Sequence, residues 1–158
     1  MKILLIVYNQ GNFIATFPHG LAYIASVLKK NKHKVIIYNQ DMHHYPEEHL
    51  THYLDHHKFD MIGVSVIGGY YQYAKLLSIS KAINNSINRP FYIIGGHCVS
   101  PEPEYFLRKT QADTICIGEG ETTIIELVNA LLNKTSLLFW RVQKSSSSLG
   151  NFISILGT

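Results

Sequence analysis

Short apolar runs of strand length alternate with stretches of helical periodicity along most of this chain. Five such runs are expected as strands, at residues 2–7, 34–38, 61–65, 91–94 and 114–117. A helical pattern separates each run from the next, and chains of this kind form parallel sheets with right-handed crossovers. The third and fourth runs are almost wholly apolar, which indicates strands that are covered on both faces.

The helical segments have recognisable ends. Pro18 suits the first position of a helix, and apolar residues then recur at helical spacing up to Asn31, the expected left-handed stop. We expect a later helix to be capped at Ser100, with Pro101 in its first turn. Helices after the first are predicted over about 46–57, 71–84, 101–109 and 122–132.

These elements predict an α/β protein with a flavodoxin-like, doubly wound sheet between two helical layers (α/β/α). We expect five parallel strands in the order 2-1-3-4-5, so that the order reverses between the first and third strands. Residues 1–134 would form this domain. Residues 135–158 form a tail of unknown role, whose apolar stretch at 152–156 fits an edge strand, a docking arm or a loosely held terminus equally well.

Composition excludes several partners. The 14 basic and 11 acidic side chains give a net charge of only +3, and the lysines near residue 30 are typical of a solvated helix end. No apolar run approaches the roughly 18 residues of a membrane span, and the apolar start has no signal-peptide cleavage site. We therefore expect a cytoplasmic protein with no nucleic-acid and no membrane partner.

Several common nucleotide and phosphate sites are excluded by their motifs. The turn after the first strand has one glycine, Gly11, where a dinucleotide fingerprint needs GxGxxG, and the chain has no GK[ST] phosphate loop. A phosphoacceptor receiver domain has the same fold but needs an aspartate at the end of the third strand, where this chain has Ser65. None of these three functions is predicted.

The nine histidines predict no metal site. His52 and His56 are four residues apart and can share one face of a helix, but no third ligand completes a known spacing, and a solvated helix face is the alternative. Cys98 and Cys116 form no CxxC pair, so we expect neither a disulfide nor zinc. The sequence therefore predicts no protein ligand to a metal.

Four of the expected strands end in polar or glycine-rich turns, at residues 8–11, 65–69, 95–96 and 118–121. Ligands of wound sheets bind outside the carboxyl ends of the strands, where the strand order reverses. Glycines allow a ligand to approach the backbone, although turn geometry alone also explains each of them. The four turns therefore predict one shared binding surface.

Several segments, in order and spacing, resemble the N-terminal cobalamin-binding domain of the cobalamin-dependent radical SAM enzymes. They are similar above all to the group that includes the anaerobic magnesium-protoporphyrin monomethyl ester cyclase. The resemblance covers about residues 1–133. It rests on residues 18–25 (PHGLAYIA), 60–65 (DMIGVS), 93–96 (IIGG), 101–102 (PE), 112–113 (AD) and 118–121 (GEGE).

The resemblance implies a set of cofactor-binding residues. Residues 65–67 and the glycine pair would line the channel for the nucleotide tail of cobalamin, the loop from 9 to 20 would lie beneath the corrin, and the turn at 118–121 would flank the tail or the corrin edge. The implied residues are Asn9, Gln10, Pro18, Gly20, Ser65, Val66, Ile67, Gly95, Gly96, Ser100, Gly118, Glu119, Gly120 and Glu121.

The resemblance also has two gaps. Asp41 and His43 are similar to the start of DxHxxG, the motif that supplies a histidine to cobalt, but Pro46 replaces the glycine and the segment follows the second strand instead of the first. We therefore expect cobalamin without an axial histidine. The CxxxCxxC motif of the radical SAM half is missing, so we expect no iron–sulfur cluster and no catalytic site on this chain.

The sequence thus predicts a cobalamin-binding module of a radical SAM methyltransferase- or cyclase-type protein that lacks the catalytic half. A second hypothesis, from the enzyme class, is that the module acts as a methyl-carrying subunit with a radical SAM catalytic domain or chain as its partner. Both a part of a longer enzyme and a stand-alone carrier fit this description. Two alternatives stay open: a flavodoxin-like binder of another nucleotide cofactor, and a degenerate domain that serves as an interaction surface.

Overall fold

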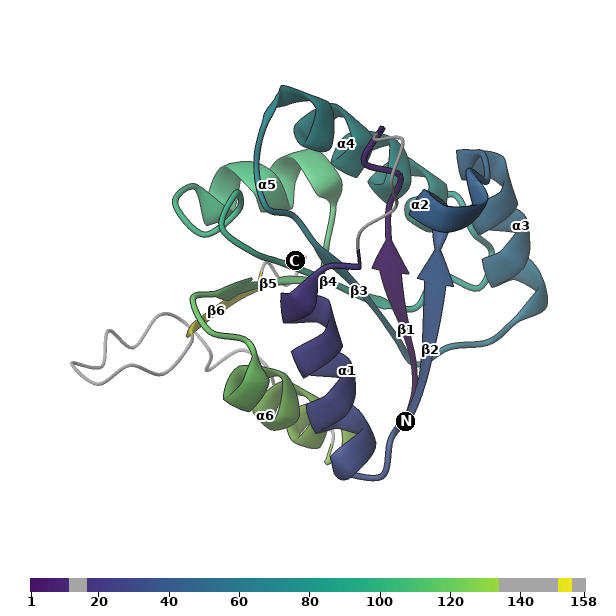
Figure 1. The fold of residues 1–158 in the computed structure, drawn as a ribbon. Helices are drawn as coiled ribbons and strands as arrows, with labels where there is room; N and C mark the ends of the chain where they lie inside the picture. Colours follow the sequence, from purple (N-terminus) through teal and green to yellow (C-terminus); the bar gives the residue numbers. More distant parts are fainter. Residues whose placement is uncertain (12–16, 134–150, 155–158) are drawn as a thin grey trace.

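The computed structural model describes residues 1–11, 17–133 and 151–154, the last of these by its backbone. Within these ranges the strands form one sheet in the order β2-β1-β3-β4-β5-β6 (Figure 1). The strands are β1 (Lys2–Val7), β2 (Lys34–Asn39), β3 (Met61–Ser65), β4 (Phe91–Gly95), β5 (Thr114–Ile117) and β6 (Asn151–Ser154).

The first five strands are parallel and confirm the doubly wound order predicted from the sequence. The sixth strand, β6, was only one of three alternatives for the tail. It runs antiparallel to β5, with Ile115 opposite Ile153, so the backbone of 151–154 forms an edge strand. The rest of the predicted tail, 135–150 and 155–158, lies outside the described residues.

Helices cover both faces of the sheet. Figure 1 shows α1 and α6 together on one face, and α3, α4 and α5 on the other. The helices are α1 (His19–Lys30), α2 (Gln40–His43), α3 (Glu47–His56), α4 (Tyr70–Asn84), α5 (Pro103–Thr110) and α6 (Glu121–Leu132). The three-layer α/β/α architecture is therefore confirmed, with one short helix, α2, added to the expected set.

Alternate residues of β1 enter two separate cores, because successive side chains of a strand point to opposite faces. Leu4 and Ile6 pack with α3, α4 and α5. Ile3 and Leu5 pack with α1 and α6 on the opposite face. Each of these side chains is almost completely buried, and such burial stabilises the fold by about 1.5–3 kcal/mol per residue. A shift of the register by one residue would exchange the two cores, so the strand order and register are firmly fixed.

Two helix ends differ from the prediction. Asn31 has φ −87°, and the left-handed residue is the next one, Lys32, with φ +63°. The amide of His33 then donates to the carbonyl of Leu28 (3.1 Å), which closes the end of α1. The later helix begins at Pro103, so the proline of its first turn is Pro103 and not Pro101.

None of the described helices is both long enough and apolar enough to cross a membrane.

Candidate functional site

The turns that follow β1, β3, β4 and β5 meet at one edge of the sheet, which we call the carboxyl rim: residues 8–11, 65–69, 95–100 and 118–121. The parallel register produces this arrangement, since Ser65 is paired with Gly95, and Gly95 with Cys116. Helices α1, α4 and α6 begin beside the rim (Figure 1). The structure therefore brings the predicted site residues to one edge or to the first turn of an adjoining helix.

The turns after β3 and β4 are packed backbone against backbone. The amide of Val66 donates to the carbonyl of Gly95 (2.9 Å), and the amide of Cys98 donates to the carbonyl of Val66 (3.2 Å). Gly96 has φ +105°, and a Cβ atom at this position would lie 2.3 Å from the carbonyl oxygen of Val66. Turn packing alone therefore requires a glycine at position 96.

Other glycines of the predicted site have different surroundings. A Cβ at Gly95 would meet the Cβ of Cys116 at 3.4 Å, and a Cβ at Gly120 would lie 2.9 Å from the Cδ1 of Ile24. At Gly20, and at Gly68 in the turn after β3, a Cβ would meet no atom of the described residues within 4 Å. Open space beside the rim is thus found at Gly20 and Gly68. The space that a Cβ would take at Gly96 and Gly120 is already filled by other atoms of the protein.

Ser100 connects two of the turns. Its hydroxyl donates to the carbonyl of Gly96 (3.0 Å) and accepts from the amide of Gly118 (3.4 Å). Gly118 and Glu119 are exposed, Ser65 and Glu121 are half-buried, and Thr123 donates to the carbonyl of Glu119 (3.1 Å). The turn after β5 therefore presents an ordered backbone and one carboxylate to solvent at the rim.

Apolar side chains lie exposed where the strand order reverses between β1 and β3. Ile67 is 59% exposed and Tyr71 is 46% exposed. The ring of Tyr71 packs against Gly11, because a Cβ there would lie 2.9 Å from its Cζ atom. Phe17 and Pro18, at the start of α1, are exposed and half-buried respectively. This ledge of Ile67 and Tyr71 offers an apolar surface whose burial by a ligand is favourable.

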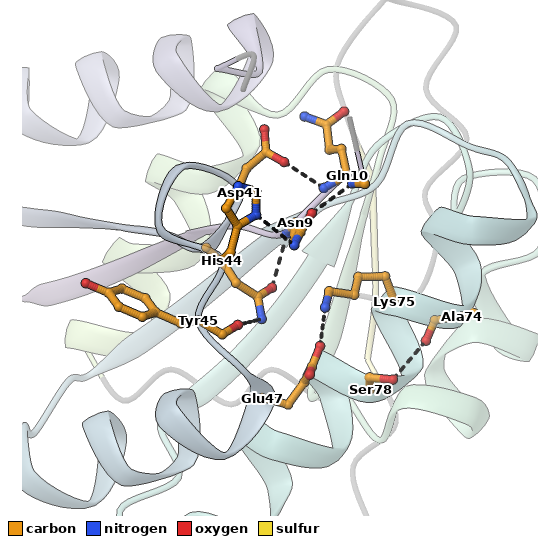
Figure 2. A network of polar contacts seen from close by, with 11 residues as sticks. Asn9, Gln10, Asp41, His44, Tyr45, Glu47, Ala74, Lys75 and Ser78 are labelled. Carbon is orange, nitrogen blue, oxygen red and sulfur yellow. Dashed lines mark hydrogen bonds and ion pairs between the residues drawn. The ribbon is translucent and has the colours of Figure 1, made fainter. Parts of the chain in front are cut away.

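A polar clamp holds the turn after β1 (Figure 2). The amide of Asn9 donates to Oε1 of Gln40 (3.1 Å), and the amide of Gln10 donates to Oδ1 of Asp41 (2.7 Å). Asn9 Nδ2 lies 3.2 Å from Nδ1 of His44. Gln40 and Asp41 are buried, so their side chains hold the backbone of residues 9 and 10 in place.

The clamp was missed by the sequence interpretation, which left residues 39–45 without an element. The side chain of Asn39 accepts from the amide of Met42 (3.0 Å), and this contact starts α2. An asparagine directly after an apolar strand is a known helix cap, and this was the available signal. Such a cap predicts a turn of helix. It does not predict that the side chains of Gln40 and Asp41 contact residues 9 and 10.

The described histidines and cysteines considered as metal ligands form no cluster that could bind a metal. Among the described residues, no group of three or more histidine, cysteine, aspartate or glutamate side chains could hold a metal ion. The rings of His52 and His56 lie 4.1 Å apart, and Nδ1 of His56 donates to the carbonyl of His52 (2.8 Å). Burial raises the pKa of the Cys116 thiol to about 12, so this side chain stays protonated. His43 is exposed and stacks on Tyr45.

The predicted site thus separates into parts. Gly20, Ile67 and Glu119 line open or exposed parts of the rim, while Val66 is buried and its backbone packs against Gly96. The predicted loop from 9 to 20 is described only in part, because residues 12–16 lie outside the described residues.

Comparison with known sequences gives a family and a relative for this chain. A family model described as the B12 binding domain matches residues 15–128. An uncharacterized methyltransferase of Pyrococcus horikoshii is 30% identical over 139 residues, which are 83% of this chain and 29% of that protein. The chain therefore spans less than a third of this relative.

Solved structures give the same picture at the level of the fold. The radical S-adenosylmethionine methyltransferase TsrM from Kitasatospora setae, solved with cobalamin and a 4Fe-4S cluster bound, has a TM-score of 0.75 and 17% identity over 87% of this chain and 28% of its own. The cobalamin-dependent S-adenosylmethionine radical enzyme OxsB, solved with aqua-cobalamin and S-adenosylmethionine bound, has a TM-score of 0.70 and 23% identity over 99% of this chain and 22% of its own. At these identities the likeness shows a common fold.

Proposed function

The chain belongs to the B12-binding domain family, and from this membership we propose that it binds cobalamin at the carboxyl rim as the cofactor-carrying module of a methyltransferase-type protein. The domain is similar to those of cobalamin-dependent radical SAM methyltransferases. The single observation that supports the location is the meeting of four strand ends at one edge, with an exposed apolar ledge at the point of reversal.

The residues present suit a large ligand with an apolar face and polar fringes. Ile67 and Tyr71 supply exposed apolar surface, and open space lies beside Gly20 and Gly68. Asn9 supplies polar groups at the end of β1, and the turn at 118–121 supplies them further along the rim, at the end of β5. An apolar macrocycle fringed with amides, such as the corrin, needs both kinds of surface, so the rim fits the cofactor that the family implies.

We assign the residues of the site to three parts. Asn9, Gln10, Pro18 and Gly20 would lie beneath the corrin. The half-buried Ser65, the backbone of Val66, the exposed Ile67 and the pair Gly95 and Gly96 would border the nucleotide tail. The remaining group would close the far side of the site: Ser100, Gly118, Glu119, Gly120 and Glu121.

No histidine is assigned to cobalt in this proposal. His43 stacks on Tyr45 and His44 contacts Asn9, so the side chains that follow β2 are engaged within the protein. When bound, cobalamin supplies a cobalt centre that can carry a methyl group. The sequence has two cysteines, and a CxxxCxxC cluster motif needs three, so we assign radical chemistry to a partner domain or chain.

Titration with hydroxocobalamin, followed by absorbance, tests the proposed function. We expect saturable binding of one equivalent with a spectrum typical of cobalt without an axial base, and no binding of flavin mononucleotide under the same conditions. Binding of the flavin in preference to the corrinoid would favour the alternative nucleotide-binding function. Failure of both ligands to bind would contradict a cofactor role.

A matched pair of variants tests the location of the site. Gly20 lies in the first turn of α1 with open space around it, so Gly20→Leu should fold normally and weaken hydroxocobalamin binding by about tenfold or more, which corresponds to about 1.4 kcal/mol. Ser26→Leu places the same side chain at an exposed position further along α1 and should leave the affinity unchanged. Equal affinities for both variants would contradict a site beside the start of α1.

A further inference from the structure

Both polar atoms of the Asn9 side chain, Oδ1 and Nδ2, have partners within the protein. Its Oδ1 accepts from the backbone amide of Gly11 (2.8 Å), and its Nδ2 lies 3.2 Å from Nδ1 of His44. An amide NH2 group only donates hydrogen bonds, so Nδ1 of His44 must accept. The imidazole of His44 is therefore neutral in this arrangement, with its proton on Nε2.

The backbone of the same segment is held by buried groups that do not move with Asn9. Gln40 donates through Nε2 to the carbonyl of Tyr45 (2.6 Å), which directs its Oε1 to the amide of Asn9. Asp41 accepts from the amide of Gln10 (2.7 Å). Since the backbone is fixed in this way, rotation of its own amide group is the route by which the side chain of Asn9 can form a hydrogen bond to a protonated His44.

Such a rotation would break the second contact. If the amide turned to offer Oδ1 to a protonated His44, its NH2 group would face the amide of Gly11, where two donors would meet. Gly11 also packs against the ring of Tyr71 in the apolar ledge. A change at His44 would therefore be transmitted through Asn9 to the surface between β1 and β3.

We propose that His44 is a positioning residue for the corrinoid site, which in its neutral form holds Asn9, and through it Gly11, in the conformation that faces the ligand. This inference rests on the proposed function and adds a regulation to it: acid that protonates His44 removes the acceptor for Asn9 and weakens binding of a corrinoid.

The charged groups near His44 already take part in other contacts. Asp41 attracts an imidazolium electrostatically but already accepts from Gln10, and Lys75 forms an ion pair with Glu47 (Figure 2). Among the described residues, the titratable and charged groups near this turn include Tyr8 at the end of β1, Asp41 and His43 in α2, Tyr45, Glu47 and His49 at and in α3, Tyr71 and Lys75 in α4, and Cys98 after β4. Of these, His43 and His49 are the other histidines and serve as internal comparisons.

The backbone of His44 suggests a conservative variant. His44 is left-handed, with φ +53° and ψ +33°, and asparagine is among the residues that tolerate this conformation best. In His44→Asn, Oδ1 is attached to Cγ as Nδ1 is in histidine, so it can accept from Asn9 at the same place but does not titrate. His43→Asn, one residue earlier, is the matched control, because His43 is exposed and stacks on Tyr45 and not on Asn9.

The first test needs no ligand. Amide NMR signals of Gly11 and of the Asn9 side chain are followed between about pH 5 and pH 8, the range in which histidine changes its charge. We expect them to titrate in the wild type and in His43→Asn, and to stay constant in His44→Asn. Titration of these signals in His44→Asn with the wild-type profile would overturn the proposal, whatever the protein binds.

The second test measures hydroxocobalamin affinity at both ends of this range. We expect the wild type and His43→Asn to bind about fivefold more weakly in acid, His44→Asn to show no such loss, and His44→Ala to bind weakly throughout; the comparison between variants cancels any pH dependence of the ligand. The same acid loss in His44→Asn as in the wild type would overturn the positioning role. No binding by any variant would instead contradict the proposed function, and the amide titration would then decide whether His44 controls this segment.

Discussion

The two halves of the carboxyl rim are held by different means. Between β1 and β2, buried side chains of Gln40 and Asp41 hold the backbone of residues 9 and 10. Between β3 and β4, the backbone of Val66 packs directly on Gly96. Side-chain contacts can be changed one atom at a time and can respond to pH, whereas the backbone contact tolerates no added atom. The first half is therefore adjustable and the second is rigid.

Gly96→Ala should have the largest effect, because it adds a Cβ to the rigid half. The new atom would lie 2.3 Å from the carbonyl of Val66 at φ +105°, and we expect the free energy of unfolding to fall by about 3 kcal/mol. Gly95→Ala is the matched control, since its Cβ would meet its nearest atom at 3.4 Å; its cost should stay under about 1 kcal/mol. Urea denaturation measures both, and equal losses would show that the two turns are not rigidly packed.

Asp41→Ala tests the adjustable half and should have an intermediate effect. It removes the acceptor of the Gln10 amide and leaves a donor without its partner, which costs about 1–3 kcal/mol. Asp41→Asn keeps an oxygen at the same position, so most of the stability should return. If Asp41→Asn were as unstable as Asp41→Ala in urea denaturation, the charge of Asp41 and not its hydrogen bond would hold the turn.

The ion pair between Glu47 and Lys75 joins the start of α3, next to the adjustable half, to α4. Its removal should have the smallest effect on stability. Burial of the Glu47 carboxyl by itself would raise its pKa, but the hydrogen bond and charge of Lys75 outweigh burial, so the pKa of Glu47 is lowered on folding. A lowered pKa contributes stability above the pKa of the unfolded state, and this contribution is lost as the pH falls through the pKa of the folded state.

Lys75→Met should therefore reduce the free energy of unfolding near pH 7 by roughly 1 kcal/mol, and the difference from the wild type should shrink as the pH falls below about 4, the ordinary range of glutamate. Urea denaturation at several pH values measures this difference. Lys81→Met alters an exposed lysine of the same helix and should show no such pH dependence. A constant difference across the range would exclude the ion pair as its source.

The sequence was sufficient for the elements that apolar periodicity defines. The five parallel strands and the two-sided core follow from apolar runs alternating with helical patterns, because burial on both faces leaves few workable arrangements. The order 2-1-3-4-5 is one of the common doubly wound orders, and the structure confirms it. The ends of the helices were less predictable. The left-handed turn falls on Lys32 instead of Asn31, and the first-turn proline is Pro103 instead of Pro101, because several neighbouring residues can serve each role.

The surroundings of the rim could be predicted only in part. The sequence placed Gly20, Gly95 and Gly96 in one set, but their spatial neighbours differ: open space, an ordinary contact and the backbone of another turn. The clamp from Asp41 to Gln10 joins residues 31 apart, and no local pattern specifies such a contact. Turn glycines can thus be located from sequence, whereas what they pack against is known only from the fold.

Amide NMR of the protein during titration with hydroxocobalamin tests the central claim most directly. If the ligand occupies the carboxyl rim, the signals that change should belong to residues 9–11, 65–69, 95–100 and 118–121, and the signals of the opposite edge, such as Lys34 and Asp60, should stay in place. Changes concentrated at that opposite edge or on the exposed histidines of α3, with the rim unaffected, would contradict the account.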